Sequence, residues 1–561
     1  MKLSRLGLFV GAACLPRLAA AGGLFLPGSG AVSTSRAGAA VASADDGEAI
    51  ALNPAGIAKS TGTTITISAA MIQYAMEFQR RGNYDAVAGE SYPYAGQPFA
   101  VEQNDASPSL GIGSIQPVPV IAVLTDLGGR LGGLHLGVGL YAPNAYPFRD
   151  MCTKQVAGCQ KYVFNSDDPN LPPPPARYDI MKQDAAVILP SLVAAYRILP
   201  NLDVGLRLSA GHASLKSTTA LWGTTASNYE EDIKKDGLFE VDATDSFVPA
   251  FGLGVAYRPT PNLELGANYS SEIDVHASGT ARSTLGPSAA FIALGPGVPP
   301  AAVTIEPLPD TAARCAPGGT AAALKGCIDL ALPMTAQIGG RYKFLDASGN
   351  LRGDVELDLD WENWGKTCSS ADIDSGSCTN ASDYRVVVDA QPLLNGKPSG
   401  LMLQTSDVQH GLHNTYGVRV GGSYHIAVGA KREHDESNEV IVRAGLGYDT
   451  AAAKTGWLRA DLDGAARTTL ALGSAYRTQR FEVSLGGGVV LEGSPSNPNV
   501  GGAAQPCNPT LAAQACSPGD NRGPSPVNPV LTPDSQAVSP VAQGDYKSHY
   551  LLVMLGVSTW F

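Results

Sequence analysis

Charged residues are scarce in this chain, and long apolar runs are scarcer still. Asp, Glu, Lys and Arg make up only 16% of 561 residues, yet no run of 18 apolar, uncharged residues follows the first 25. This excludes a protein that crosses a membrane with helices. A basic excess is also lacking, because the formal net charge is −12, and this argues against a nucleic-acid partner.

Patterns that carry catalysis or bind metals are missing as well. The eight histidines stand in no recognisable catalytic context, and no Gly-x-Ser-x-Gly motif occurs, so we do not expect an enzyme. The cysteines show no Cys-x-x-Cys spacing and no histidine lies among them. We therefore expect neither a metal site nor a cofactor.

The first 21 residues have the features of a secretory signal peptide. Lys2 and Arg5 supply the positive start, residues 6–15 are apolar, and residues 18–21 are suited to cleavage. A lipoprotein anchored at Cys14 is the alternative, but Gly11 stands where a lipobox has Leu or Val. The mature chain then begins at residue 22, outside the cytoplasm.

The remaining cysteines fall into four close pairs. An even number of locally paired cysteines in an exported chain favours disulfides that staple loops. The expected bonds are Cys152–Cys159, Cys315–Cys327, Cys368–Cys378 and Cys507–Cys516.

Strands with alternating polar and apolar residues dominate from residue 62 onward. Within 328–344, Leu330, Leu332, Ile338 and Tyr342 fall on one face, and polar residues fall on the other. The stretch from Asp354 to Glu362 alternates carboxylates with apolar residues in the same way. An apolar face of this length would aggregate in water, but it suits a membrane barrel, in which it faces lipid and the carboxylates face the lumen.

The pattern predicts an all-β fold: a 14-stranded antiparallel transmembrane β-barrel over residues 62–561. Short and long connections alternate around it, as in bacterial barrels with periplasmic turns and long outer loops, and the cysteine pairs fall in the long ones. The predicted strands are 62–79, 117–127, 132–143, 177–198, 202–220, 247–259, 262–281, 328–344, 351–364, 413–427, 438–452, 467–479, 480–493 and 546–561.

Aromatic residues mark both the barrel rim and the C-terminus. Tyrosines recur where strands run into the short turns, which is typical of an aromatic girdle. They are Tyr196, Tyr257, Tyr342, Tyr424 and Tyr476. The last strand ends in Phe561 on its apolar face, which resembles the C-terminal signal that outer-membrane barrels present to their assembly machinery.

Residues 22–61 do not alternate, and their small residues and turn formers predict an internal plug, or hatch. The acidic stripe from Asp354 to Glu362 invites a second interpretation, as a path for cations. We favour pairing with lumen arginines such as Arg341, Arg352 or Arg419, since unpaired buried charges are costly.

Several motifs together resemble the FadL/TodX-type family, which transports long-chain fatty acids and other hydrophobic compounds. Those of the hatch are Arg36-Ala37-Gly38, Ala44-Asp45-Asp46 and Asn53-Pro54-Ala55-Gly56. Those of the barrel are residues 251–257, Leu330-Ala331-Leu332-Pro333 and Trp361-Glu362-Asn363-Trp364. The resemblance covers residues 22–561 except the outer loops.

The resemblance implies an outer-membrane transporter whose partners are hydrophobic small molecules and membrane lipid. Substrate would enter an apolar pocket near the outer loops and leave sideways into the bilayer at a kinked strand near the hatch. The substrate-binding and hatch residues are then Leu24, Phe25, Leu26, Asp45, Asp46, Asn53 and Pro54, with Phe25 displaced by ligand. Gly137 and Gly139 of the third strand are the candidates for the lateral gate, although glycines that merely permit curvature explain them equally well.

Two other functions remain open on the sequence alone. A general porin has an open polar lumen, which does not agree with a plug of about 40 residues. An adhesion or receptor role for the long outer loops is compatible with transport.

Overall fold

The computed structural model describes most of the chain from residue 23 to the C-terminus. The described ranges are 23–130, 132–152, 172–221, 231–286, 303–368, 378–398, 406–408, 410–428, 438–454, 457–462, 464–497 and 543–561. The predicted signal peptide and Cys159, Cys507 and Cys516 lie outside these ranges. No helix in the described ranges is long and apolar enough to cross a membrane.

Fourteen antiparallel strand courses form one closed barrel, as predicted, and several courses consist of two strands in line. In chain order they are β1 (Thr63–Arg80), β3 (Ile115–Thr125), β4 (Leu134–Tyr141) with β5 (Arg149–Asp150), β6 (Lys182–Leu199), β7 (Leu202–Leu221), β8 (Gly237–Thr260), β9 (Leu263–Ser270) with β10 (Ile273–Leu285), β12 (Leu324–Leu332) with β13 (Thr335–Leu345), β14 (Leu351–Glu362) with β15 (Tyr384–Leu394), β17 (Ser406–Val408) with β18 (Thr415–Val428), β19 (Asn438–Asp449), β20 (Arg467–Arg477), β21 (Phe481–Leu491) and β22 (Gly544–Trp560).

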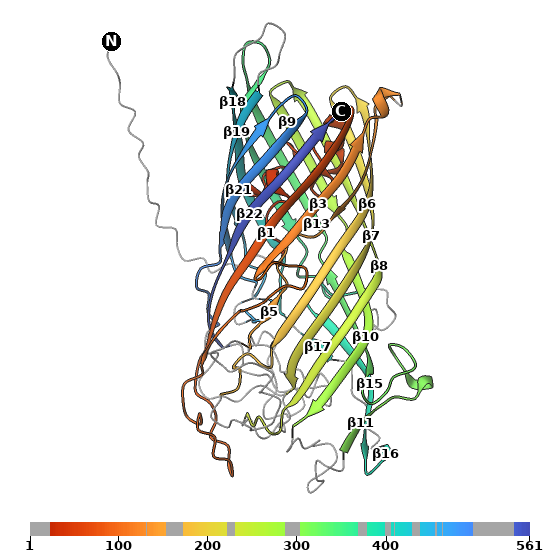
Figure 1. The fold of residues 1–561 in the computed structure, drawn as a ribbon, viewed down its shortest axis with the longest axis vertical. Helices are drawn as coiled ribbons and strands as arrows, with labels where there is room; N and C mark the ends of the chain where they lie inside the picture. Colours follow the sequence, from red (N-terminus) through yellow and green to blue (C-terminus); the bar gives the residue numbers. More distant parts are fainter. Residues whose placement is uncertain are drawn as a thin grey trace, which may run out of the picture.

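The last strand pairs with the first and closes the barrel. The β1–β22 ladder runs without a break from Thr64 opposite Trp560 to Arg80 opposite Gly544. Short turns gather at the end that holds the C-terminus, and the long connections gather at the opposite end (Figure 1). The short strands β2 (Val101–Gln103), β11 (Val303–Pro307) and β16 (Lys397–Pro398) pair with strands at that loop end.

The half of the barrel near the short turns is apolar outside and polar inside. On β14, Leu357 is 49% exposed whereas Asp358 is fully buried. The five rim tyrosines all have exposed side chains, which agrees with an aromatic girdle. Phe561 is exposed at the end of β22, and its role in assembly stays a prediction.

Near the loop end, three neighbouring courses invert this pattern. The inversion occurs at residues 245–247 of β8, at 271–272 between β9 and β10, and at 333–334 between β12 and β13. A shift of one residue turns every following side chain to the other face of a strand. Beyond the shift, apolar residues such as Val241 and Val275 are buried inside, and His276 lies exposed outside.

The prediction of one strand over 328–344 with a single apolar face is therefore wrong. Leu330 and Leu332 of β12 line an internal cavity, whereas Ile338 and Tyr342 of β13 are exposed on the outer face. The alternation continues through Pro333 in the sequence, but the interruption at 333–334 reverses its direction in space. The prediction for β8 also began too late, at 247, because the strand starts at Gly237.

Two of the predicted disulfides are formed by described cysteines, Cys315–Cys327 and Cys368–Cys378. Cys152 is also disulfide-bonded. Cys327 lies within β12 rather than in the preceding loop, so its bond ties the loop to the barrel wall.

Candidate functional site

Residues 23–61, the N-terminal segment, lie inside the barrel in its short-turn half. The segment contains α1 (Ala31–Thr34), α2 (Ala49–Leu52) and the 3-10 helix η1 (Pro54–Lys59). Its core is almost completely buried, including Ile50 and Ile57 at 0% exposure. α1 contacts β20, β21, β22 and β1, and η1 contacts β4, β6, β7 and β8.

The acidic stripe on β14 holds this segment in place. The Arg36 guanidinium donates to Asp354 at 2.8 Å and to Glu356 at 2.9 Å, and all three side chains are buried. Glu356 and Asp358 also accept hydrogen bonds from backbone amides of residues 40–43. The main partner of the stripe is thus the N-terminal segment.

The predicted arginine partners of the stripe are found in part. Arg341 pairs with Asp354, and Arg419 pairs with Asp360. Arg352 instead pairs with Asp346 in the turn between β13 and β14, at 2.8 Å. Among described residues, each carboxylate of the stripe has at least one polar partner, which argues against a cation path.

Most of the other predicted hatch residues hold the N-terminal segment in shape, and one of them is exposed. The Asn53 amide donates to the carbonyl oxygens of Val41 and Val255, and Pro54 begins η1. Asp46 accepts from the Glu48 amide at 2.9 Å, whereas Asp45 is exposed.

Sequence reasoning missed Glu48, which is 1% exposed. Its carboxylate accepts hydrogen bonds from the amides of Val32 and Ser33 and from the Ser68 hydroxyl of β1. A buried carboxylate with several donors fixes the start of α1 to the barrel wall. No motif in the sequence distinguishes this glutamate from a surface one.

Glycines on the inner wall make room for the segment. A Cβ atom on Gly205 of β7 would lie 2.3 Å from the Ala55 nitrogen, and one on Gly254 of β8 would lie 2.2 Å from Asn53 Oδ1. Such a separation is far below contact distance. The Asn-Pro-Ala-Gly motif and these strand glycines therefore fit together as one interface.

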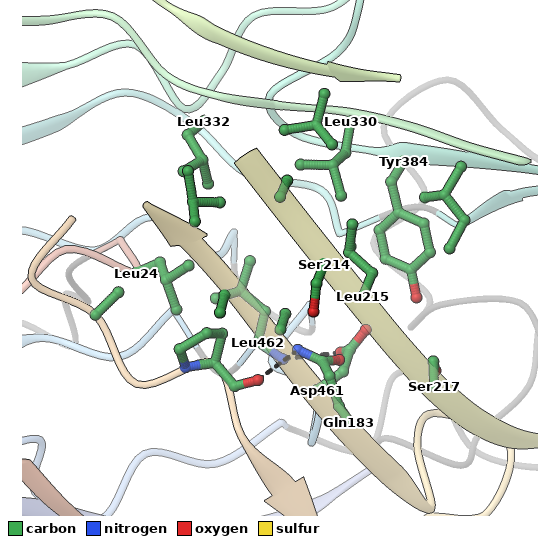
Figure 2. Close-up of a pocket in the computed structure, with 18 of the residues that line it drawn as sticks. Leu24, Gln183, Ser214, Leu215, Ser217, Leu330, Leu332, Tyr384, Asp461 and Leu462 are labelled. Atoms are coloured by element: carbon green, nitrogen blue, oxygen red, sulfur yellow. Dashed lines mark hydrogen bonds between the residues drawn. The ribbon is translucent and has the colours of Figure 1, made fainter. Parts of the chain in front are cut away.

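A cavity of about 380 Å³ lies between the N-terminal segment and the outer loops. Its wall is largely apolar and comes mainly from β6, β7, β8, β10, β12 and β15. These strands include the parts of β8, β10 and β12 in which apolar residues face inward. Figure 2 shows Leu24 and Leu332 on one side of it, and Tyr384, Gln183 and Ser217 on the other. A largely apolar cavity of this size with a few polar groups is typical of a small-molecule site.

The start of the N-terminal segment reaches this cavity. Leu24 lines it directly, whereas the Phe25 ring packs on Trp364, another lining residue, with ring centroids 5.5 Å apart. Leu26 is buried, and its amide donates to the Asn144 carbonyl. The structure thus places Leu24 on the cavity and Phe25 one layer behind it.

The barrel wall is incomplete beside the cavity. β4 pairs with β3 only from Val120 to Thr125, and after Tyr141 the chain leaves the wall before rejoining β6 as β5. Consecutive residues of β3 (116–119) and of β6 (185–188) line the cavity. Since consecutive strand residues face opposite sides of a wall, the cavity continues around both strand edges to the outer surface.

Gly137 and Gly139 lie in the paired part of β4, opposite Leu124 and Ala122. A Cβ atom on Gly139 would lie 2.6 Å from Ile50 of the N-terminal segment, so this glycine permits close approach of the segment. The gap begins beyond both glycines, and their role in a gate stays a prediction.

Two prolines in β3 could have located the gap. Pro117 and Pro119 have no N–H group to donate to a neighbouring strand, and proline in a sheet is confined to edges and bulges. Both line the cavity. The Asn144 side chain, which donates to the carbonyl oxygens of Pro27 and Gly28, had no such signal.

Comparison with known proteins gives one family and several solved structures. A family model described as outer membrane protein transport protein (OMPP1/FadL/TodX) matches residues 12–489. A FadL homologue from Pseudomonas aeruginosa has a similar structure, with a TM-score of 0.62 and 14% identity, over 96% of this chain and 100% of that one. No curated protein matches the sequence.

Two toluene transporters have the same fold. TbuX of Ralstonia pickettii gives a TM-score of 0.54 at 13% identity, over 96% of this chain and 99% of that one. TodX of Pseudomonas putida gives 0.53 at 13% identity, with the same coverage.

Proposed function

Because this chain belongs to the outer membrane protein transport family (OMPP1/FadL/TodX), we propose that it carries long-chain or aromatic hydrophobic molecules through the cavity and sideways into the bilayer. The observation that carries the proposal is the continuity of an apolar cavity with a gap in the barrel wall. The protein is a β-barrel of the outer membrane, and its family consists of transporters rather than enzymes.

The position of the gap suits delivery to lipid. On the short-turn side of the gap, the exposed outer residues of the strands around it are apolar, such as Ile67 on β1 and Leu192 on β6. On the loop side of the gap, they include Gln73 on β1, which is exposed. A molecule that leaves through the gap therefore emerges at the outer edge of the apolar band.

The energetics favour this route over an aqueous channel. Each buried CH₂ group contributes about 0.8 kcal/mol, so an alkyl chain held in an apolar cavity would lose that energy on return to water. Passage from the cavity to the lipid chains keeps the molecule in apolar surroundings throughout.

The N-terminal segment links occupancy of the cavity to the gap. Leu24 lines the cavity, and two residues later the Leu26 amide binds Asn144, which lies in the stretch that leaves the wall after β4. We expect a ligand to displace Leu24, with Phe25 following, and to loosen this stretch. Movement of the stretch would then widen the gap.

Two ligand classes are compatible with the apolar lining. Long-chain fatty acids are the class that the sequence favours, and the toluene transporters of similar fold suggest aromatic hydrocarbons.

Uptake measurements test the proposal. Labelled oleate and labelled toluene would be offered to a Gram-negative host that lacks its own fatty acid transporter and expresses this protein. Uptake of either that depends on the protein supports the proposal. No protein-dependent uptake of either from a folded barrel contradicts it, and a strong ion conductance through the intact protein would favour a porin instead.

A further inference from the structure

One end of the cavity is polar, and it contains no unpaired cation among the described lining residues. The charged residues that line the cavity are Lys216, Asp383 and Asp461. Lys216 pairs with Asp242 at 2.8 Å on the outer face of the wall, where both side chains are more than half exposed. The inner surface of this end is therefore acidic.

The guanidinium beside Asp461 is already shared between two carboxylates. Arg459 lies 3.0 Å from Asp461 and 3.4 Å from Asp179, and all three side chains are buried. Asp461 also accepts from the His410 ring at 2.9 Å. Asp383 accepts from the backbone amide of the same histidine at 3.0 Å.

The neutral polar groups of this end come from three different strands. The Tyr384 hydroxyl of β15 points into the cavity, on the side where Gln183 of β6 and Ser217 of β7 lie (Figure 2). Gln183 donates to the Pro147 carbonyl, which leaves its side-chain oxygen as an acceptor. A tyrosine or serine hydroxyl both donates and accepts, so the end matches a group that does the same.

From this arrangement we propose that the cavity selects hydrophobic molecules with an uncharged hydrogen-bonding head, above all a hydroxyl group, and discriminates against carboxylates. The inference rests on the proposed function and, among the ligand classes named there, disfavours long-chain fatty acids. A carboxylate at this end would be desolvated without a free cation among the described lining residues and would lie beside the carboxylates of Asp383 and Asp461. A hydroxyl group carries no charge to desolvate and finds both a donor and an acceptor.

Binding of molecules that differ only in the head group tests the inference. The full-length mature protein would be placed in lipid nanodiscs at pH 7.5, with empty nanodiscs subtracted. Displacement of labelled 1-hexadecanol by 1-hexadecanol, palmitate and hexadecane then ranks the affinities of different head groups on alkyl chains of one length. We expect hexadecanol to bind at least about tenfold more tightly than palmitate, since like-charge juxtaposition costs several kcal/mol and tenfold is 1.4 kcal/mol.

Two variants connect the preference to the polar end. Tyr384→Phe should weaken hexadecanol binding by about threefold to tenfold, the loss of one hydrogen bond, and leave hexadecane unchanged. Tyr416→Phe is the matched control, because that ring is exposed on the outer face of β18.

The possible outcomes separate this inference from the proposed function. Palmitate binding as tightly as the alcohol, or an unaffected Tyr384→Phe variant, would overturn the head-group preference alone. If none of the probes bound, including hexadecane, both the preference and the hydrophobe cavity would be refuted.

Discussion

Arg36→Met should release the N-terminal segment from the wall while the barrel stays folded. The guanidinium makes two buried ion pairs, with Asp354 at 2.8 Å and Glu356 at 2.9 Å, and a third bond to the Ala39 carbonyl at 2.8 Å. None of these bonds belongs to the strand ladders. Their loss therefore weakens the attachment of the segment rather than the barrel.

The free-energy cost of the substitution depends on which partners Asp354 and Glu356 keep. Removing one partner of a buried ion pair costs about 3–5 kcal/mol when the other charge is left uncompensated. Asp354 keeps Arg341 as a partner, and Glu356 keeps the amides of Ala42 and Ser43. We therefore expect a cost at the lower end of this range, about 3 kcal/mol. A change of that size raises the population of molecules with a released segment by about a hundredfold.

Hydrogen exchange measured by mass spectrometry checks this value. Amides of residues 40–58 should exchange about a hundredfold faster in Arg36→Met, and those of β14 should not change. Arg352→Met is the matched control, because its ion pair with Asp346 is 41% exposed on the arginine side and contributes at most about 1 kcal/mol. Unchanged exchange over 40–58, or an equal effect in the control, would refute the reasoning.

Three further predictions concern the segment, the cavity and the outer loops. Gly205→Val should push η1 off the wall, because a Cβ there lies 2.3 Å from the Ala55 nitrogen, and ion conductance in planar bilayers should rise. Leu24→Asp should weaken binding of hydrophobic ligands at least about tenfold, because it places a charge in the apolar wall, as displacement assays would measure. Burial raises the pKa of Asp236 to about 6 and that of Glu102 to about 8. Exchange protection of the amides of residues 176–181 should therefore fall from pH 5 to pH 8.5, after correction for the intrinsic rate.

The sign of the pH effect comes from the direction of both shifts. A carboxyl group whose pKa is raised by folding binds its proton more tightly in the folded state. Its contribution to stability is therefore present at low pH and is lost as the pH rises through the folded-state value. Protection that instead increased over this range would contradict the burial of both groups.

Matched changes elsewhere serve as controls for the two substitutions. Gly340→Ala adds a methyl group whose nearest neighbour is the flexible end of Leu265 at 3.5 Å, so conductance should not change. Phe25→Asp should weaken ligand binding less than Leu24→Asp, because the Phe25 ring contacts Trp364 behind the cavity wall. Equal losses from both would contradict the placement of Leu24.

The strands were predictable from the sequence because a two-residue period is a local property. All fourteen courses, the closing position of the last strand and the rim tyrosines follow from it. The inversion at residues 333–334 was not predictable, because Leu330 and Ile338 keep the same parity along the chain and only the pairing with β9 and β10 reverses their direction.

The candidate site was predictable only where a motif carried it. Asn53-Pro54 and Arg36 could be identified by resemblance, but the partner of Arg36 lies 318 residues away, and nothing local indicates it. The gap was expected at Gly137 and Gly139, whereas the unpaired edge was encoded by Pro117 and Pro119 on the neighbouring strand. The polarity of the cavity depends on side chains from several strands and loops that are far apart in the sequence, and no linear pattern combines them.

Uptake by a variant in which a bulky side chain blocks the gap tests the lateral route most directly. Ala186 and Leu192 lie on the same face of β6. Only Ala186 lines the gap, whereas Leu192 is exposed on the outer surface nearer the short turns. Labelled 1-hexadecanol uptake should fall at least about tenfold in Ala186→Trp and remain unchanged in Leu192→Trp, with equal amounts of folded barrel. Normal uptake in Ala186→Trp would contradict exit through the wall and would leave the barrel axis as the route.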